Sequence, residues 1–146
     1  MYPESDILYN LLVDKGLDMS AGAHVLIIDD DAIMRDLMAD WLEAAGYGVR
    51  KAADCSAAVA EVQRAAPALI ISDMFMPGPC GAMAIAQMRQ AVPGVHVIAV
   101  SGHFNSGQGL SAQGALEAGA ARALAKPVKR AELVQAVAEL LGPPAP

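Results

Sequence analysis

The chain has 146 residues, enough for one domain whose core needs neither disulfides nor metals to hold it together. Its net charge of −6 argues against binding to nucleic acids or anionic membranes, because both partners require clusters of Lys and Arg. The acidic start of the chain lacks the basic segment of a secretory signal, and no apolar run is long enough to span a bilayer. We therefore expect a cytoplasmic protein with no nucleic-acid and no membrane partner.

The cysteines and histidines form no metal-binding pattern. Cys55 and Cys80 do not make a CxxC pair, and the histidines, His24, His96 and His103, are scattered along the sequence. We therefore expect no zinc site and interpret both cysteines as free thiols in a reducing compartment.

Residues 1–22 form an extension that precedes the first strand pattern. Ser5 is a suitable cap for a short amphipathic helix that ends near Lys15-Gly16. Its apolar residues recur at helical spacing and are Ile7, Leu8, Leu11 and Leu12. Three interpretations remain open: a targeting or partner-binding helix, a start of translation at Met19 that makes the extension an artefact, or, as we prefer, a helix docked on its own domain or frayed.

From His24 onward, strand-like and helix-like apolar patterns alternate five times. The predicted strands cover residues 25–28, 47–51, 69–71, 95–100 and 121–125. The predicted helices cover residues 33–46, 54–67, 82–91, 111–118 and 129–141, and Gly142-Pro143-Pro144 ends the last one. This alternation is typical of a three-layer α/β domain, a parallel sheet with helices on both faces. We assign residues 1–22 to the extension, 23–142 to the domain and 143–146 to a Pro-rich tail.

The third predicted strand ends in a charge. Residues 69–71 are apolar without alternation, as in a central strand that is buried on both faces. Asp73 then stands at the carboxyl end of this strand, where open α/β sheets bind their ligands. Asp also caps turns, so that Asp73 taken alone has two interpretations of equal weight.

The other strands also end in polar residues. These are Asp29, Asp30 and Asp31 after the first strand, Ser101 after the fourth and Lys126 after the fifth. If the strand order is the flavodoxin-like 2-1-3-4-5, the first and third strands are neighbours, and Asp29, Asp30 and Asp73 crowd into one pocket. Carboxylates at such short distances repel one another, and a divalent cation relieves the repulsion. Oxygen ligands alone favour Mg²⁺ or Mn²⁺ over zinc.

Lys126 adds a positive charge to this pocket, and Ser101 adds a hydroxyl donor. A metal ion, an ammonium group and a hydroxyl around one carboxylate make a site for a phosphoryl group. The carboxylate can itself be the nucleophile and form an acyl phosphate.

Four motifs at these strand ends, VLIIDDD, ISDMFMPGPCG, VIAVSG and ALAKP, resemble the receiver domain of two-component response regulators over residues 24–141. The resemblance implies that Asp73 is the phosphoacceptor and that Asp29 and Asp30 form the acidic pair that holds Mg²⁺. The implied partner is a histidine kinase or a phosphotransfer protein, which transfers its phosphoryl group to Asp73.

The resemblance also assigns roles to the fourth and fifth strand ends. Ser101 matches the switch hydroxyl, Lys126 matches the lysine that contacts the phosphoryl group, and the bond from Lys126 to Pro127 is expected to be cis. Phosphorylation is then expected to shift the surface near the fourth helix and fifth strand between two packings. No output domain follows the fifth helix, so we expect a stand-alone bacterial receiver that is not an enzyme and signals to a downstream protein by contact.

Several positions depart from the pattern of the family. Ala123 stands where receivers usually have Tyr or Phe as an aromatic switch, and residues 102–113 form a longer loop. Cys80 replaces the usual Asp or Asn before the turn glycine. Phe75 and His103 occupy positions that tune the lifetime of the phosphate. Because position 123 is Ala, no aromatic ring at this position can report phosphorylation.

Three alternatives to the receiver are open. Residues 107–112 fit a GxGxxA dinucleotide fingerprint, but they follow the fourth strand rather than the first and do not adjoin it. A haloacid-dehalogenase-like phosphatase would use Asp29 as nucleophile and Asp31 as general acid, but the later acidic pair is missing. The serious alternative is a receiver-like adaptor that binds its partner whether or not Asp73 is phosphorylated, and Ala123 motivates it.

Overall fold

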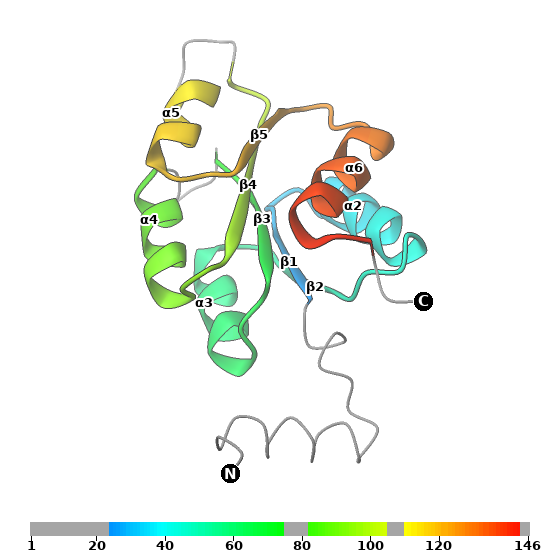
Figure 1. Cartoon of the computed structure of the whole chain (residues 1–146), viewed down its shortest axis with the longest axis horizontal. Helices are drawn as coiled ribbons and strands as arrows, with labels where there is room; N and C mark the ends of the chain where they lie inside the picture. Colours follow the sequence, from blue (N-terminus) through cyan, green and yellow to red (C-terminus); the bar gives the residue numbers. More distant parts are fainter. Residues whose placement is uncertain (1–23, 75–81, 105–109, 144–146) are drawn as a thin grey trace.

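The computed structural model describes residues 24–74, 82–104 and 110–143. Within them, five parallel strands form one sheet in the order β2-β1-β3-β4-β5 (Figure 1). The strands are β1 (Val25–Ile28), β2 (Val49–Ala52), β3 (Leu69–Asp73), β4 (His96–Ser101) and β5 (Arg122–Ala125). The predicted α/β flavodoxin-like architecture and its strand order are confirmed, whereas the predicted helix in residues 1–22 lies outside the described residues.

Helices cover both faces of the sheet (Figure 1). The helices α2 (Ala32–Ala44) and α6 (Arg130–Leu141) lie on one face, and α3 (Cys55–Arg64), α4 (Ala82–Ala91) and α5 (Ala112–Ala118) lie on the other. The side chains of Asp31, Asp54 and Ser111 cap α2, α3 and α5 by accepting hydrogen bonds from backbone N–H groups. Each such cap stabilises its helix by about 1 kcal/mol.

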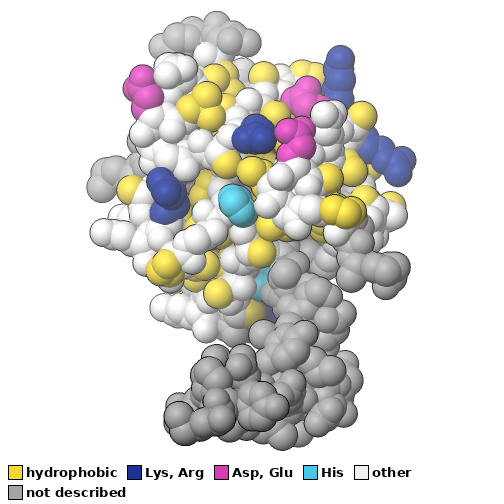
Figure 2. Space-filling view, in the orientation of Figure 1, with side chains coloured by type: hydrophobic (Ala, Val, Ile, Leu, Met, Phe, Trp, Pro, Cys, Tyr) yellow, Lys and Arg dark blue, Asp and Glu magenta, His cyan; other side chains and the backbone are white. Residues whose placement is uncertain are grey.

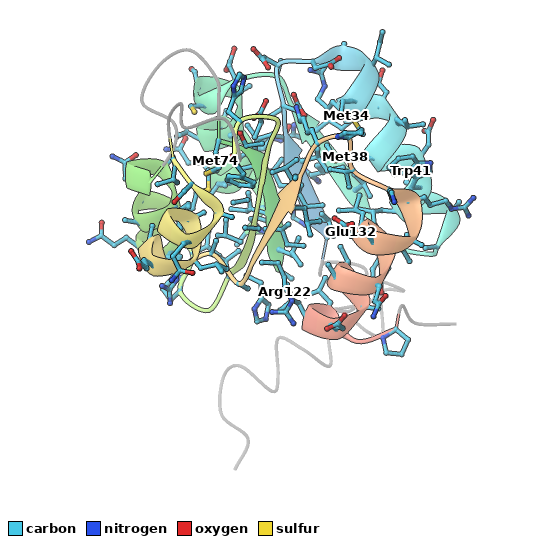
Figure 3. The ribbon with its side chains drawn as sticks, turned by 90° about the horizontal axis from the view of Figure 1, so that it is seen from above. Met34, Met38, Trp41, Met74, Arg122 and Glu132 are labelled. Carbon is cyan, nitrogen blue, oxygen red and sulfur yellow. The ribbon has the colours of Figure 1, made fainter. Side chains whose placement is uncertain are left out.

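The alternation of strand residues creates two cores, one on each face. In β1, Val25 and Ile27 join the core under α2 and α6, and Leu26 and Ile28 join the core under α3, α4 and α5. Each of these buried aliphatic side chains stabilises the fold by about 1.5–3 kcal/mol. Figure 3 shows Met34, Met38 and Trp41 on the side of α2 that turns toward α6, where they complete the first core.

The strand register brings the strand ends to one edge of the sheet. Ile28 pairs with Ser72, so Asp29 and Asp73 follow as the next neighbours on β1 and β3. Ser101 pairs with Ala125, which places Lys126 directly after β5. Parallel pairing thus gathers residues that are far apart in sequence.

Two apolar residues of α2 depart from the predicted buried stripe. Ile33 is 81% exposed and Leu37 is 41% exposed, whereas Met38 and Leu42, on the same helix, are buried. Ile33 and Leu37 are four residues apart and therefore share one face of α2, which turns away from the core side that carries Met38 and Leu42. The predicted helical period is correct, but it did not show which apolar residues of the helix would be buried.

The interpretation of the cysteines as free thiols is wrong for Cys55. Cys55 is disulfide-bonded, and none of the described cysteines is free. The only other cysteine of the sequence, Cys80, lies outside the described residues. Cys55 is the first residue of α3.

Candidate functional site

Two carboxylates are buried side by side where β1 and β3 end. Asp29 is 0% exposed and Asp73 is 5% exposed. Asp30 lies beside them on the exposed side, and the three residues offer oxygen atoms that all lie within 4.8 Å of one another. Buried carboxylates are costly unless an opposite charge accompanies them, so this pocket requires cations.

Lys126 supplies one cation directly. Its Nζ lies 2.9 Å from Oδ2 of Asp29 and 3.2 Å from Oδ2 of Asp73. Burial alone would lower the pKa of the Lys126 ammonium, but its contact with Asp29 and the charges of Asp73 and Asp29 outweigh burial and raise the pKa above its usual value. Lys126 is therefore a permanent positive charge between the two strands.

The backbone around Asp29 holds its carboxylate in place. Oδ1 of Asp29 accepts a hydrogen bond of 2.9 Å from the N–H of Asp31, and the carbonyl oxygen of Asp29 accepts one of 2.7 Å from Nη1 of Arg35. Asp31 in turn caps α2, because its Oδ1 accepts from the N–H groups of Ile33 and Met34. The start of α2 and the end of β1 thus form one hydrogen-bonded unit.

The ends of β4 and β5 close the other side of the pocket. Ser101 is buried, and its Oγ accepts a hydrogen bond of 2.9 Å from the N–H of His103. The N–H of Lys126 donates to the carbonyl oxygen of Ser101, which fixes the lysine backbone beside β4. A small cavity of about 120 Å³ lies here and is lined by Asp73, Gly102, His103 and Lys126. It provides room next to the Asp73 carboxylate for a compact group.

The acidic residues fit a divalent cation. Oδ2 of Asp29 is buried, and among the described residues it makes no hydrogen bond of acceptable geometry, although Lys126 Nζ is near. Asp30 adds a solvent-exposed carboxylate to the same group. Three neighbouring carboxylates, one of them exposed to solvent, form an all-oxygen donor set that suits Mg²⁺, which keeps several waters when it binds.

The structure brings together four of the predicted site residues, Asp29, Asp30, Asp73 and Lys126, and it places Ser101 at the adjoining strand end. The predicted cis bond between Lys126 and Pro127 is present. Ala123 is half-buried on β5, and His103 is half-buried beside the cavity. Phe75 and Cys80 lie outside the described residues.

Sequence reasoning did not identify Arg35. Its guanidinium contacts the carbonyl oxygen of Asp29, the residue that ends β1. The only available signal was a lone cation in the second turn of a helix whose first turn carries the cap. Such a signal is too common to single out a residue.

The geometry also bears on two of the alternatives. A general acid at position 31 is disfavoured, because one oxygen of the Asp31 carboxylate already accepts two backbone N–H groups as the cap of α2. The dinucleotide fingerprint requires a helix that starts at once after its strand, but α5 starts at Ala112 and β4 ends at Ser101.

Comparisons with known proteins place this site in a family. A family described as the response regulator receiver domain matches residues 25–138, and the chain belongs to this family. Its relatives include the C4-dicarboxylate transport transcriptional regulatory protein DctD of Rhizobium meliloti, which is 35% identical over 117 residues, covering 80% of this chain and 25% of DctD. The chain spans between 25% and 54% of the length of three curated bacterial regulators, DctD among them.

Solved structures show the same fold. The chemotaxis protein CheY4 of Vibrio cholerae matches with a TM-score of 0.71 and 28% identity over 82% of this chain and 98% of CheY4. A response regulator protein of Burkholderia pseudomallei, crystallised with a phosphorylated aspartic acid, a calcium ion and citrate, matches with a TM-score of 0.67 and 25% identity over 81% of this chain and 65% of that chain.

Membership of this family establishes the general class of activity. Receiver domains of response regulators are signalling domains of two-component systems that are phosphorylated on an aspartate and bind Mg²⁺ at a cluster of acidic residues. Among the described helices, none is long and apolar enough to cross a membrane.

Proposed function

We propose that this chain accepts a phosphoryl group on Asp73 from a histidine kinase or a phosphotransfer protein and signals by contact with a downstream protein. The observation that carries the proposal is the position of Lys126. Its ammonium bridges the buried carboxylates of Asp29 and Asp73 beside the exposed Asp30. Such an arrangement fits a phosphoacceptor, because the same charges stabilise a phosphoryl group once it has arrived.

In the proposed transfer, a carboxylate oxygen of Asp73 attacks the phosphorus of a phosphohistidine on the donor. The phosphorus–nitrogen bond breaks, the imidazole leaves and takes a proton from solvent, and an acyl phosphate forms on Asp73. Lys126 stays within reach of the new phosphoryl oxygens because its backbone is held to Ser101. Asp29, Asp30 and Asp73 would hold Mg²⁺, which neutralises negative charge on the phosphoryl group.

Ser101 supports a way to sense the new group. Its buried hydroxyl accepts from the N–H of His103 and can donate its own proton to a phosphoryl oxygen. Such a hydrogen bond would draw the segment after β4 toward Asp73. Because Ala123 carries no ring, we expect this segment, rather than an aromatic side chain, to transmit the signal.

The structure of the Burkholderia pseudomallei relative supports the proposed phosphorylation and the proposed metal site, since it contains a phosphorylated aspartic acid and a calcium ion. The proposal extends to the domain limits of 23–142, with residues 1–22 as an extension and 143–146 as a tail. It also includes action as a stand-alone receiver, although the curated relatives are longer proteins.

Intact-mass spectrometry after incubation with acetyl phosphate tests the transfer. We expect one added phosphoryl group in the presence of Mg²⁺, a much smaller yield in EDTA, and no adduct in Asp73→Asn. Asp40→Asn is the matched control, because Asp40 is an exposed aspartate on α2 outside the acidic group.

Two results would contradict the proposal. Loss of the adduct in Asp29→Asn together with full retention in Asp73→Asn would favour the phosphatase alternative. No adduct under any condition would favour an adaptor that acts without phosphate, the alternative that the small half-buried Ala123 supports.

A further inference from the structure

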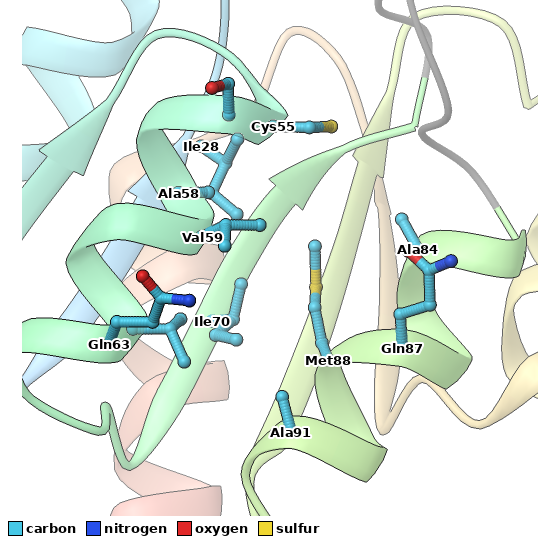
Figure 4. A pocket seen from close by; sticks show the side chains of 12 residues that line it. Ile28, Cys55, Ala58, Val59, Gln63, Ile70, Ala84, Gln87, Met88 and Ala91 are labelled. Atoms are coloured by element: carbon cyan, nitrogen blue, oxygen red, sulfur yellow. The ribbon is translucent and has the colours of Figure 1, made fainter.

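An apolar groove separates α3 from α4 on the face of the sheet opposite α2 and α6. Its volume is about 440 Å³. Val59 of α3 lies in one wall, Met88 and Ala91 of α4 lie in the other, and Ile28 and Ile70 of the sheet form the floor (Figure 4). Val62 of α3 also lines the groove. Among the described residues, none that lines the groove is charged.

The groove exists because small side chains face one another across it. Ala58 of α3 and Ala84 of α4 both lie in its lining, and neither can reach the opposite helix. An apolar group that filled the groove would remove this apolar lining from water and add dispersion contacts to it. Val59 is 56% exposed at the mouth of the groove. Hydrophobic side chains are scattered over the face of the molecule that Figure 2 shows.

We propose that the groove binds the apolar face of residues 5–16 of the same chain. That segment carries a stripe at helical spacing, formed by Ile7, Leu8, Leu11 and Leu12. As a helix it would be about 18 Å long, close to the roughly 15 Å of α3 along the groove wall. An uncharged groove suits an apolar stripe, because no buried charge is left without a partner.

The path of the chain allows this docking. The carbonyl oxygen of His24 accepts a hydrogen bond of 3.0 Å from the N–H of Ala68, so the chain enters at the edge where β1 and β3 begin. Because α3 and α4 run opposite to the strands, Gln63 near the end of α3 and Ala91 at the end of α4 lie toward the same edge. Residues 17–23 can span at most about 25 Å when fully extended, which is enough to lead the segment back over the groove.

The tether favours this occupant over others. A segment joined to its site by a short flexible linker has an effective concentration on the order of millimolar, without any partner in solution. At equal affinity, a second copy of the chain or a small apolar molecule would need a concentration above that value to displace the tethered segment. The groove also lies on the face of the sheet away from α2, so occupation leaves Asp30 open to a phosphodonor.

Amide NMR of the full ¹⁵N-labelled chain tests the proposal. We expect residues 7–12 to show the heteronuclear NOE of ordered backbone, and we expect Leu11→Asp to abolish it and to shift the amides of Val59, Val62 and Met88. Asn10→Asp is the matched control, since it adds the same charge on the opposite side of the predicted helix and should change little.

A second pair of variants tests the groove itself. Val59→Asp should release residues 7–12 as Leu11→Asp does, whereas Ala60→Asp, at an exposed neighbouring position outside the lining, should not. Both sites are exposed in α3, so neither change is expected to unfold the domain. The proposal is overturned if residues 7–12 behave as free chain in the unmodified protein. It is also overturned if sedimentation shows a dimer that dissociates on dilution and residues 7–12 lose their order at the same dilution. The occupant would then belong to a second copy of the chain.

Discussion

At the scale of single residues, Lys126 offsets the negative charge of the acidic pocket. One ammonium contacts two carboxylates that parallel strand pairing forces together, and the pKa of the lysine is raised as a result. Removal of one partner from a buried ion pair leaves uncompensated charge. The stability of the fold and the chemistry of the site therefore depend on the same side chain.

We expect Lys126→Met to lower the free energy of unfolding by about 2 kcal/mol, less than the roughly 3–5 kcal/mol of a fully buried pair, because the Lys126 side chain keeps 20% exposure. Urea unfolding followed by Trp41 fluorescence measures the loss. Added Mg²⁺ should restore part of it by replacing the missing charge. Lys129→Met, at an exposed position, is the control and should be near neutral. Equal stability of both variants would show that Lys126 does not offset the negative charge of Asp29 and Asp73.

Asp30 allows the metal site to be tested without phosphate. A ligand that binds only the folded state stabilises it, by about 1.4 kcal/mol at ten times its Kd. We expect the melting temperature of the unmodified chain to rise with Mg²⁺ and that of Asp30→Asn to rise much less. The matched change Asp40→Asn should leave the rise intact. An equal rise in both variants would place the ion elsewhere.

At the scale of elements, the junction between β1 and α2 couples the fold to the site. Asp29 accepts from the N–H of Asp31, Asp31 caps α2, and Arg35 from the second turn donates back to the carbonyl of Asp29. The cap therefore has a structural role, and the phosphatase alternative would require Asp31 to act as an acid instead.

Asp31→Ala separates these two roles. We expect a loss of about 1 kcal/mol in the free energy of unfolding, the usual cost of an N-cap, with phosphorylation of Asp73 largely preserved because the backbone N–H at position 31 remains. Asp36→Ala, an exposed position within α2, is the control. Urea unfolding and the acetyl phosphate assay give the two readouts. Abolished phosphorylation in a folded Asp31→Ala would support a catalytic acid.

At the scale of the whole molecule, one sheet is shared by two cores. Ile70 faces the core under α3, α4 and α5, and its neighbour Ile71 faces the core under α2 and α6. Because β3 lies at the centre of the sheet, loss of packing on one face should weaken both. Such a domain is expected to unfold in a single transition.

Conservative changes on the two faces test this coupling. Ile70→Val and Ile71→Val should each cost about 0.5–1.5 kcal/mol, and both should lower the urea midpoint reported by Trp41. Trp41 is the only tryptophan and packs against the core that contains Ile71. If Ile70→Val left the Trp41 midpoint unchanged while circular dichroism detected a loss, the two faces would unfold separately.

The strand order and the acidic pocket could be predicted because both leave local marks in the sequence. Apolar runs that end in Asp29, Asp73 or Lys126 are uncommon, and parallel pairing aligns such ends without further information. Features that depend on how helices sit in space left no such mark. The contact of Arg35 with a carbonyl six residues earlier depends on how α2 leaves the end of β1, and the exposure of Ile33 depends on which face of α2 meets the sheet. The disulfide bond of Cys55 likewise could not be inferred from the spacing of the two cysteines.

The most direct test of the central claim is to locate the phosphoryl group on the chain. Borohydride reduces an acyl phosphate to an alcohol and so marks the residue that carried it, which tandem mass spectrometry of the digested protein can identify. After incubation with acetyl phosphate and Mg²⁺, we predict the mark at Asp73 and at no other aspartate. A mark at Asp29, or an adduct that survives Asp73→Asn, would contradict the account.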